Sequence, residues 1–184
     1  MGFNNDKLGF KPKLYWDDLP PREVIFNPSG AAVAPVIDTT TGFQLWRDTF
    51  DNIVAYRFQM PHNWYKTTFN FHVHFAKTTA AAGTVEFKVK YAECPIGQPI
   101  GAFSTNTAMT EVMTVGSTVN QGIASINITP GSNASISTTY LIWLERDATV
   151  GNANDTYGAD VMVIDVDLHI QKYADLGSVN EYSR

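Results

Sequence analysis

Two histidines lie one residue apart in the stretch FNFHVHF, residues 69–75. Side chains two residues apart on a β-strand point to the same side, so His72 and His74 would share one face. Imidazole nitrogens bind Zn²⁺ and other transition metals when further ligands complete the set. Three alternatives follow: a metal site, a contact between subunits through histidine–aspartate hydrogen bonds, and a face that only meets solvent.

Groups that could pair with these histidines occur near the end of the chain. Asp165, Asp167 and His169 alternate with apolar residues in the stretch 160–171, which predicts that they share one face of a strand. In a jelly-roll order this strand is the antiparallel neighbour of the histidine strand. Cross-strand partners then lie about 4.5–5.5 Å apart between Cβ atoms. We favour a contact between subunits at this face, with no metal bound.

A cupin-like metalloenzyme is the specific enzyme alternative. Cupins follow His-x-His with a glutamate three or four residues later and a third histidine on a later strand. Here no glutamate follows His74 until Glu86, and the stretch CPIGQPIG contains no histidine. A serine-nucleophile elbow and a P-loop are also missing from the sequence. We therefore predict a protein that is not an enzyme, with no catalytic residues and no cofactor.

Loop carboxylates offer a second possible chemistry. Asp147, Asp155 and Asp160 could form a glycosidase pair or a calcium loop. Their spacing matches no known loop pattern, so we favour a solvated loop.

The elements that must hold these residues are strands of period two. Turn-forming clusters separate them and no helix is predicted with the necessary spacing. The eight predicted strands span residues 43–47, 53–60, 69–76, 84–93, 109–115, 122–129, 138–146 and 160–171. This pattern predicts an all-β fold, an eight-stranded jelly-roll β-sandwich. An immunoglobulin-like sandwich is the alternative, but its Cys and Trp markers are missing.

The first 40 residues have a different character. They hold five of the nine prolines, which block regular ladders, together with apolar residues. We predict an extended N-terminal arm over 1–40, followed by the sandwich domain over 41–184. The arm would dock on its own domain or on a neighbouring subunit through Trp16, Leu19, Ile25 and Phe26.

The strand at 138–146 is apolar on both faces. Tyr140, Ile142 and Leu144 alternate with Leu141 and Trp143. A strand with one wet face should alternate between apolar and polar residues. We therefore expect the arm or another subunit to cover Leu141 and Trp143.

Trp64 follows a turn in the stretch PHNW. We favour a structural corner, with this ring packed on the sandwich. The alternative is an exposed ring that stacks on a sugar, which would make Trp64 a glycan contact.

The composition argues against several classes of partner. The chain has 184 residues, enough for one domain, and a net charge of −5 with no basic patch, which argues against nucleic acid. The one cysteine, Cys94, excludes an internal disulfide. No secretion signal and no run of about 18 apolar residues occurs, so we expect folding in the cytoplasm and no membrane partner.

Three short motifs resemble a family of structural proteins from tailed bacteriophages. The stretches are LYWDDLPPREV, FQMPHNWYKTTFNFHVHFAKTT and DLHIQKYADLGSVNEY. The matching residues are Trp16, Asp17, Asp18 and Leu19, then Pro61, His62, Trp64, His72, Val73 and His74, and finally His169, Tyr173, Asp175, Gly177 and Ser178. Phe71 and Phe75 depart from the proline and tryptophan that are common in this family.

The resemblance implies a virion component. The function we expect is a capsid decoration or cement protein, a homo-oligomer and most simply a homotrimer, bound to the major capsid protein or another virion protein. The alternative is a receptor- or glycan-binding head of a fibre or spike, and a cupin-like metalloenzyme ranks third.

Overall fold

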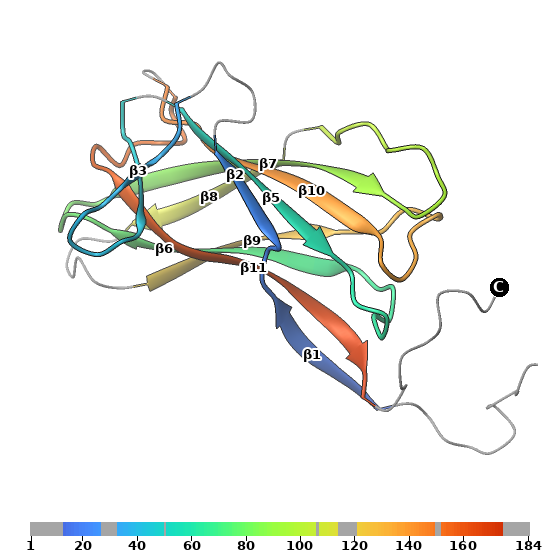
Figure 1. Cartoon of the computed structure of the whole chain (residues 1–184). Helices are drawn as coiled ribbons and strands as arrows, with labels where there is room; N and C mark the ends of the chain where they lie inside the picture. The colour runs from blue at the N-terminus through green and yellow to red at the C-terminus, as the bar shows by residue number, and fades with distance from the viewer. Residues whose placement is uncertain are drawn as a thin grey trace, which may run out of the picture.

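The computed structural model describes residues 13–26, 33–49, 51–105, 107–113, 121–149 and 152–174, and all regular structure in these ranges is β (Figure 1). The strands are β1 Leu14–Leu19, β2 Glu23–Phe26, β3 Val36–Ile37, β4 Gln44–Trp46, β5 Asn52–Gln59, β6 Phe69–Lys77, β7 Gly83–Cys94, β8 Thr107–Met113, β9 Gln121–Ile128, β10 Thr139–Arg146 and β11 Val161–Tyr173. These ranges contain no helix that could cross a membrane.

Two antiparallel sheets form a sandwich. The histidine sheet has the order β3-β4-β11-β6-β9, with β1 on β11, and the second sheet has the order β2-β5-β10-β7-β8. The predicted jelly-roll neighbours are confirmed, because β4, β11, β6 and β9 are the first, eighth, third and sixth of the eight predicted strands. The fold class is therefore the predicted all-β sandwich of jelly-roll type.

Strand alternation builds the core between the sheets. The apolar residues of β6 point inward and are at most 4% exposed: Phe69, Phe71, Val73 and Phe75. Side chains of β5, β7, β10 and β11 meet them from the other strands. Burying each such side chain stabilises the fold by about 1.5–3 kcal/mol before entropy is subtracted. The same alternation turns the two histidines of β6 to the outer face.

A β-bulge in β11 changes the predicted face of that strand. The register against β6 shifts between Val163 and Asp165, so Val161 and Val163 point inward before it. Strict alternation with the later residues of the strand predicts Met162 and Ile164 on the inward face, and this is wrong because a bulge inserts one extra residue. After the bulge the predicted alternation holds, and Asp167 lies opposite the histidine strand.

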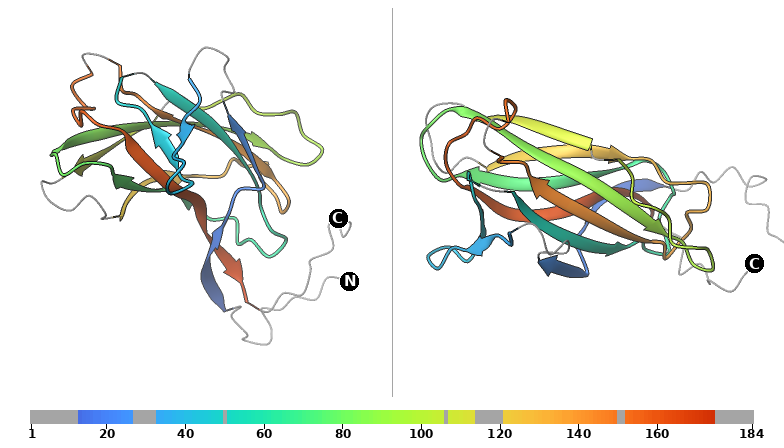
Figure 2. Two further views of the ribbon diagram at one scale, coloured as in Figure 1. Left: turned by 60° about the vertical axis from the view of Figure 1, so that its left-hand side comes forward. Right: turned by 90° about the horizontal axis from the view of Figure 1, so that it is seen from above.

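The described part of the predicted arm belongs to the sandwich. β1 pairs with β11, β2 with β5 and β3 with β4. The arm was expected to dock either on its own domain or on a neighbouring subunit, and the described segments pair with strands of their own domain. They are therefore part of the sandwich, although they precede the predicted boundary at residue 40. β1 and the end of β11 run beyond the sandwich body as a two-stranded ribbon (Figures 1 and 2). Arm residues 1–12 and 27–32 lie outside the described residues.

Candidate functional site

Three side chains converge on the outer face of the histidine sheet. His74 Nε2 lies 2.8 Å from Asp167 Oδ2, and His72 Nδ1 lies 3.3 Å from Asp167 Oδ1. One ligand atom from each of the three residues lies within 4.8 Å of the others. The predicted meeting of the histidine strand with the late aspartate strand is thus confirmed.

The register explains which ring nitrogen each histidine presents. Asp167 is the direct cross-strand partner of His72, so the near nitrogen Nδ1 suffices. His74 is diagonal to Asp167, two residue pairs further along the strands, and reaches it with the far nitrogen Nε2. Diagonal neighbours lie farther apart than direct partners, about 7–8 Å against 4.5–5.5 Å.

Asp167 is buried although it lies on the outer face. Its relative exposure is 8%, and its Oδ1 is a buried oxygen without a hydrogen-bond partner. Burial lowers the pKa of His72, an effect that the Asp167 charge opposes and the neighbouring histidines reinforce. This keeps the imidazole neutral, with a nitrogen lone pair available, at neutral pH.

A row of stacked rings extends this cluster toward β1. His169 stacks on His72 with ring centroids 5.5 Å apart, and Trp16 stacks on His169 at 4.7 Å with an interplanar angle of 13°. His169 Nδ1 is 2.7 Å from Asp18 Oδ1. Asp18 was not predicted as a site residue. Its contact with His169, 151 residues later in the chain, exists only because β1 pairs with β11.

The remaining predicted interface residues fall elsewhere. Asp165 is exposed at the bulge, where its Oδ1 accepts the backbone N–H of Val166. Leu19 packs against the core of its own domain. Ile25 and Phe26 lie on β2, the edge strand of the second sheet, and are 37% and 47% exposed.

Trp64 is a corner of the fold and not an exposed platform. Its ring is 2% exposed and packs edge-on against Phe69 and Tyr140 at 6.0 and 6.4 Å between centroids. The favoured interpretation of Trp64 as a structural corner is therefore confirmed, and the alternative, a glycan contact at this ring, is wrong. The reason is an antiparallel bridge between Trp64 and Lys172, which draws the turn onto the sandwich.

The outer face of β10 is covered from within the chain. Phe103, in the segment after β7, contacts the ring of Trp143 at 5.0 Å, and Lys90 Nζ lies 4.2 Å from the same ring centroid. Leu141 is half-buried. We had expected the arm or another subunit here, whereas the described cover over Trp143 comes from Phe103 and Lys90.

A second polar cluster closes one end of the sandwich. Arg146 is 0% exposed and makes a two-bond contact with Asp155 through Nε and Nη2, at 2.9 and 3.0 Å. Its other donors reach the backbone carbonyls of Trp46, Tyr157 and Ala159. This closed cluster ties the segment before β11 to the end of β10.

The other loop acids are also paired with cations. Asp160 bonds Arg47 at 3.2 Å, and Asp147 bonds Lys88. Glu86 is 3% exposed and accepts hydrogen bonds from the side-chain amides of Asn152 and Asn154. These contacts hold the loop, and the expectation of freely solvated carboxylates is wrong for them.

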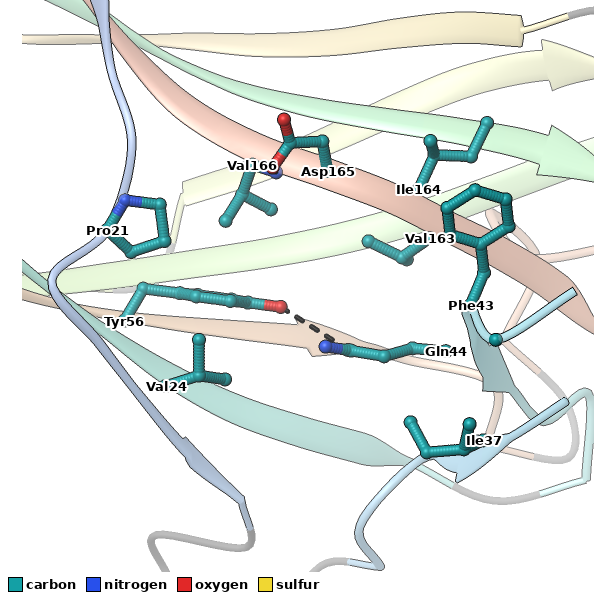
Figure 3. A pocket seen from close by; sticks show the side chains of 11 residues that line it. Pro21, Val24, Ile37, Phe43, Gln44, Tyr56, Val163, Ile164, Asp165 and Val166 are labelled. Atoms are coloured by element: carbon teal, nitrogen blue, oxygen red, sulfur yellow. Dashed lines mark hydrogen bonds between the residues drawn. The ribbon is translucent and has the colours of Figure 1, made fainter. Parts of the chain in front are cut away.

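A small apolar cleft opens at the sandwich edge between β2 and the β3–β4 pair (Figure 3). Its volume is about 190 Å³. Apolar side chains line most of it, and its polar groups include Gln44 and the hydroxyl of Tyr56, which are 3.5 Å apart. Burial raises the pKa of Tyr56, so this phenol stays protonated.

Comparison with known proteins gives fold likenesses only. No protein-family model matches the chain, and no curated protein matches it in sequence. Among solved structures, a CBM35 of Abf62 from Cellvibrio japonicus is similar with a TM-score of 0.45 and 13% identity, over 89% of this chain and 100% of that one. A Xyl-CBM35 in complex with a disaccharide that contains glucuronic acid gives 0.42 and 11%, over 89% and 99%.

A third similar structure is the CBM22-1 and GH10 pair of Clostridium thermocellum xylanase 10B, complexed with xylohexaose. Its TM-score is 0.39 with 14% identity, over 90% of this chain and 30% of that one. Scores this low do not carry an argument about the ligand of this chain.

Proposed function

We propose that this chain is a non-catalytic binding domain for glycans, and that the sugar lies on the outer face of the histidine sheet beside Trp16. The observation that carries the proposal is the exposed, fixed indole of Trp16. It is 49% exposed, and the parallel stack on His169 holds its orientation.

A sugar ring has an apolar C–H face and a rim of hydroxyl groups. An indole offers a large apolar surface for the first, at a low cost in side-chain entropy. The carboxylate of Asp18, with 68% of its side chain exposed, stands beside His169 and can accept hydrogen bonds from hydroxyl groups. Aromatic and polar groups thus lie together on one fixed strand pair, which reduces the ordering cost of binding.

The ion pairs of the loop carboxylates are consistent with a domain that binds without catalysis. Asp155, Asp147 and Asp160 are the loop carboxylates that a hydrolytic pair would use. Each is held by a cation in the described structure.

A glycan array with the full chain tests this proposal. The matched variants are Trp16→Ala and Phe26→Ala, since the two rings are 49% and 47% exposed on different strands. We expect Trp16→Ala to weaken binding at least about tenfold, a loss of about 1.4 kcal/mol, and Phe26→Ala to leave it unchanged. Failure to bind any glycan, or an equal loss in both variants, would contradict the proposal.

A second candidate function rests on the apolar edge of the sandwich. Three apolar side chains that line the cleft, Val24, Ile37 and Phe43, are between 38% and 48% exposed. Phe26 on β2 and Val36 on β3, the same two edge strands, are 47% and 44% exposed. Contiguous exposed apolar residues along unpaired edge strands mark protein contacts. Together with the resemblance to tailed-phage proteins, this edge supports a virion structural protein, a decoration or cement subunit that assembles with itself and with the major capsid protein.

Phe26→Glu and Ile37→Glu test the assembly candidate. Sedimentation of the full chain should show an oligomer, with a trimer as the simplest form, that either variant dissociates while Trp16→Ala does not. A monomer at all concentrations that also fails to bind phage heads would overturn this second candidate and leave the first untouched.

A further inference from the structure

The cluster of His72, His74 and Asp167 contains a buried polar atom that makes no hydrogen bond. Three atoms that can bind a cation face one another, and one of them, Asp167 Oδ1, is buried without a hydrogen-bond partner. A buried carboxylate oxygen left in this state costs free energy, on the order of 1–3 kcal/mol or more. A ligand at this position would remove that cost.

We propose that His72 Nδ1, His74 Nε2 and the carboxylate of Asp167 bind one divalent transition-metal ion. Two imidazole nitrogens and one carboxylate form a set that suits Zn²⁺ and the neighbouring ions Co²⁺ and Ni²⁺, in preference to Ca²⁺ or Mg²⁺. The ligand set uses neither Trp16 nor Asp18, although His72 stacks on His169, the ring that also stacks on Trp16.

The distance between His72 and Asp167 matches that between two ligands of a tetrahedral ion, and one ligand atom of each of the three residues lies within 4.8 Å of the others. With metal–ligand bonds of about 2.0–2.2 Å, two ligand atoms of a tetrahedron lie roughly 3.3 Å apart. His72 Nδ1 and Asp167 Oδ1 are 3.3 Å apart, and His74 Nε2 and Asp167 Oδ2 are 2.8 Å apart.

The backbone already supplies this arrangement. Both histidines project from β6, a strand paired on both edges, and Asp167 projects from its neighbour β11. Ligands on paired strands are held more precisely than ligands on loops. His72 and His74 each keep 19% of their side chains exposed, so the ion can enter and its fourth position faces solvent.

Zinc titration of the EDTA-treated full chain tests the site by calorimetry, with native mass spectrometry for stoichiometry. We expect one Zn²⁺ per chain. Asp167→Asn keeps the shape of the residue and an acceptor for His74, yet should weaken binding at least about 100-fold, beyond the range seen for outer-shell changes. His74→Gln should do the same.

His62→Ala is the matched control. This histidine is exposed and lies in the turn before β6, outside the cluster. The His62→Ala variant should bind Zn²⁺ as the unaltered chain does. In both proteins, bound Co²⁺ should give the visible absorption of a tetrahedral site. Absence of stoichiometric uptake, uptake that survives Asp167→Asn, or uptake lost with His62→Ala would each overturn the proposal. Thermal melting in EDTA shows that the variants are folded.

Discussion

Two polar clusters on this sandwich differ in how completely their hydrogen bonds are made. In the closed cluster, the five N–H donors of Arg146 make five bonds to Asp155 and to three backbone carbonyls. In the histidine cluster, the buried Oδ1 of Asp167 has no hydrogen bond, although His72 Nδ1 lies 3.3 Å away. A satisfied network holds the fold together, whereas an unsatisfied one in an otherwise well-packed protein indicates a place for a ligand.

Removing the guanidinium of the closed cluster should have the largest effect. Arg146→Met leaves Asp155 as a buried charge without its cation and should lower the free energy of unfolding by about 3–5 kcal/mol. The control is Arg57→Met, whose pair with Glu23 is about half exposed and should cost less than about 1 kcal/mol. Urea denaturation measures both, and equal losses would break the comparison.

Gly83 tests the close approach of the loop that carries the closed cluster. Its φ of +155° and a backbone atom of Tyr157 at 2.7 Å from an added Cβ leave no room for a side chain. Gly83→Ala should therefore destabilise the fold by at least about 1–3 kcal/mol. Gly158→Ala, with open space around the added Cβ, should change the free energy of unfolding by no more than about 0.5 kcal/mol. A similar loss in both variants would show that the close contact is unimportant.

The histidine cluster should contribute little to stability without metal. Asp167→Asn keeps the bond to His74 and removes a poorly satisfied charge, so we expect a change within about 1 kcal/mol in EDTA. Added Zn²⁺ should raise the melting temperature of the unaltered chain and leave that of Asp167→Asn unchanged. A large loss of unfolding free energy in EDTA would show that the histidine cluster stabilises the fold, as the closed cluster of Arg146 does.

The smallest effect concerns the exposed border of the closed cluster, the pair of Asp147 and Lys88. Burial pushes the pKa of Asp147 up, but hydrogen bonds from Lys88 and Thr149 outweigh it, and the net pKa lies below its ordinary value of 3.8. The hydrogen bond that Lys88 donates to Asp147 raises the pKa of Lys88 above its ordinary value of 10.5, against the effect of burial.

The sign of the pH dependence follows from these directions. The carboxylate stabilises the fold above about pH 4, and this contribution is lost as the pH falls through its folded-state pKa; the ammonium contribution is lost as the pH rises beyond about 10.5. When the pH falls from 6 to 2, Lys88→Met should lose less free energy of unfolding than the unaltered chain, by under about 1 kcal/mol. Denaturation midpoints between pH 2 and 6 measure it, and an unchanged pH profile would contradict the pairing.

Local sequence patterns were sufficient for β4 to β11 and for the meeting of the two histidines with Asp167, whereas β1, β2 and β3 lie in the segment predicted as an extended arm. Period-two alternation identifies inward faces, and the jelly-roll order then determines which strands are neighbours. Both steps use only nearest-neighbour rules of β-structure.

Long-range pairing accounts for the features that the sequence did not predict. The partnership of Asp18 with His169 and the cover of Phe103 over Trp143 depend on how loops and edge strands settle on the sandwich. The bulge after Val163 and the burial of Trp64 likewise depend on contacts between segments distant in the chain. No periodicity in the sequence records such contacts.

Anomalous diffraction from crystals of the full chain grown with Zn²⁺ tests most directly whether the unsatisfied cluster is a ligand site. The account predicts one strong zinc peak within about 2.0–2.2 Å of His72 Nδ1, His74 Nε2 and a carboxylate oxygen of Asp167. An empty cluster in crystals that hold zinc elsewhere would contradict it.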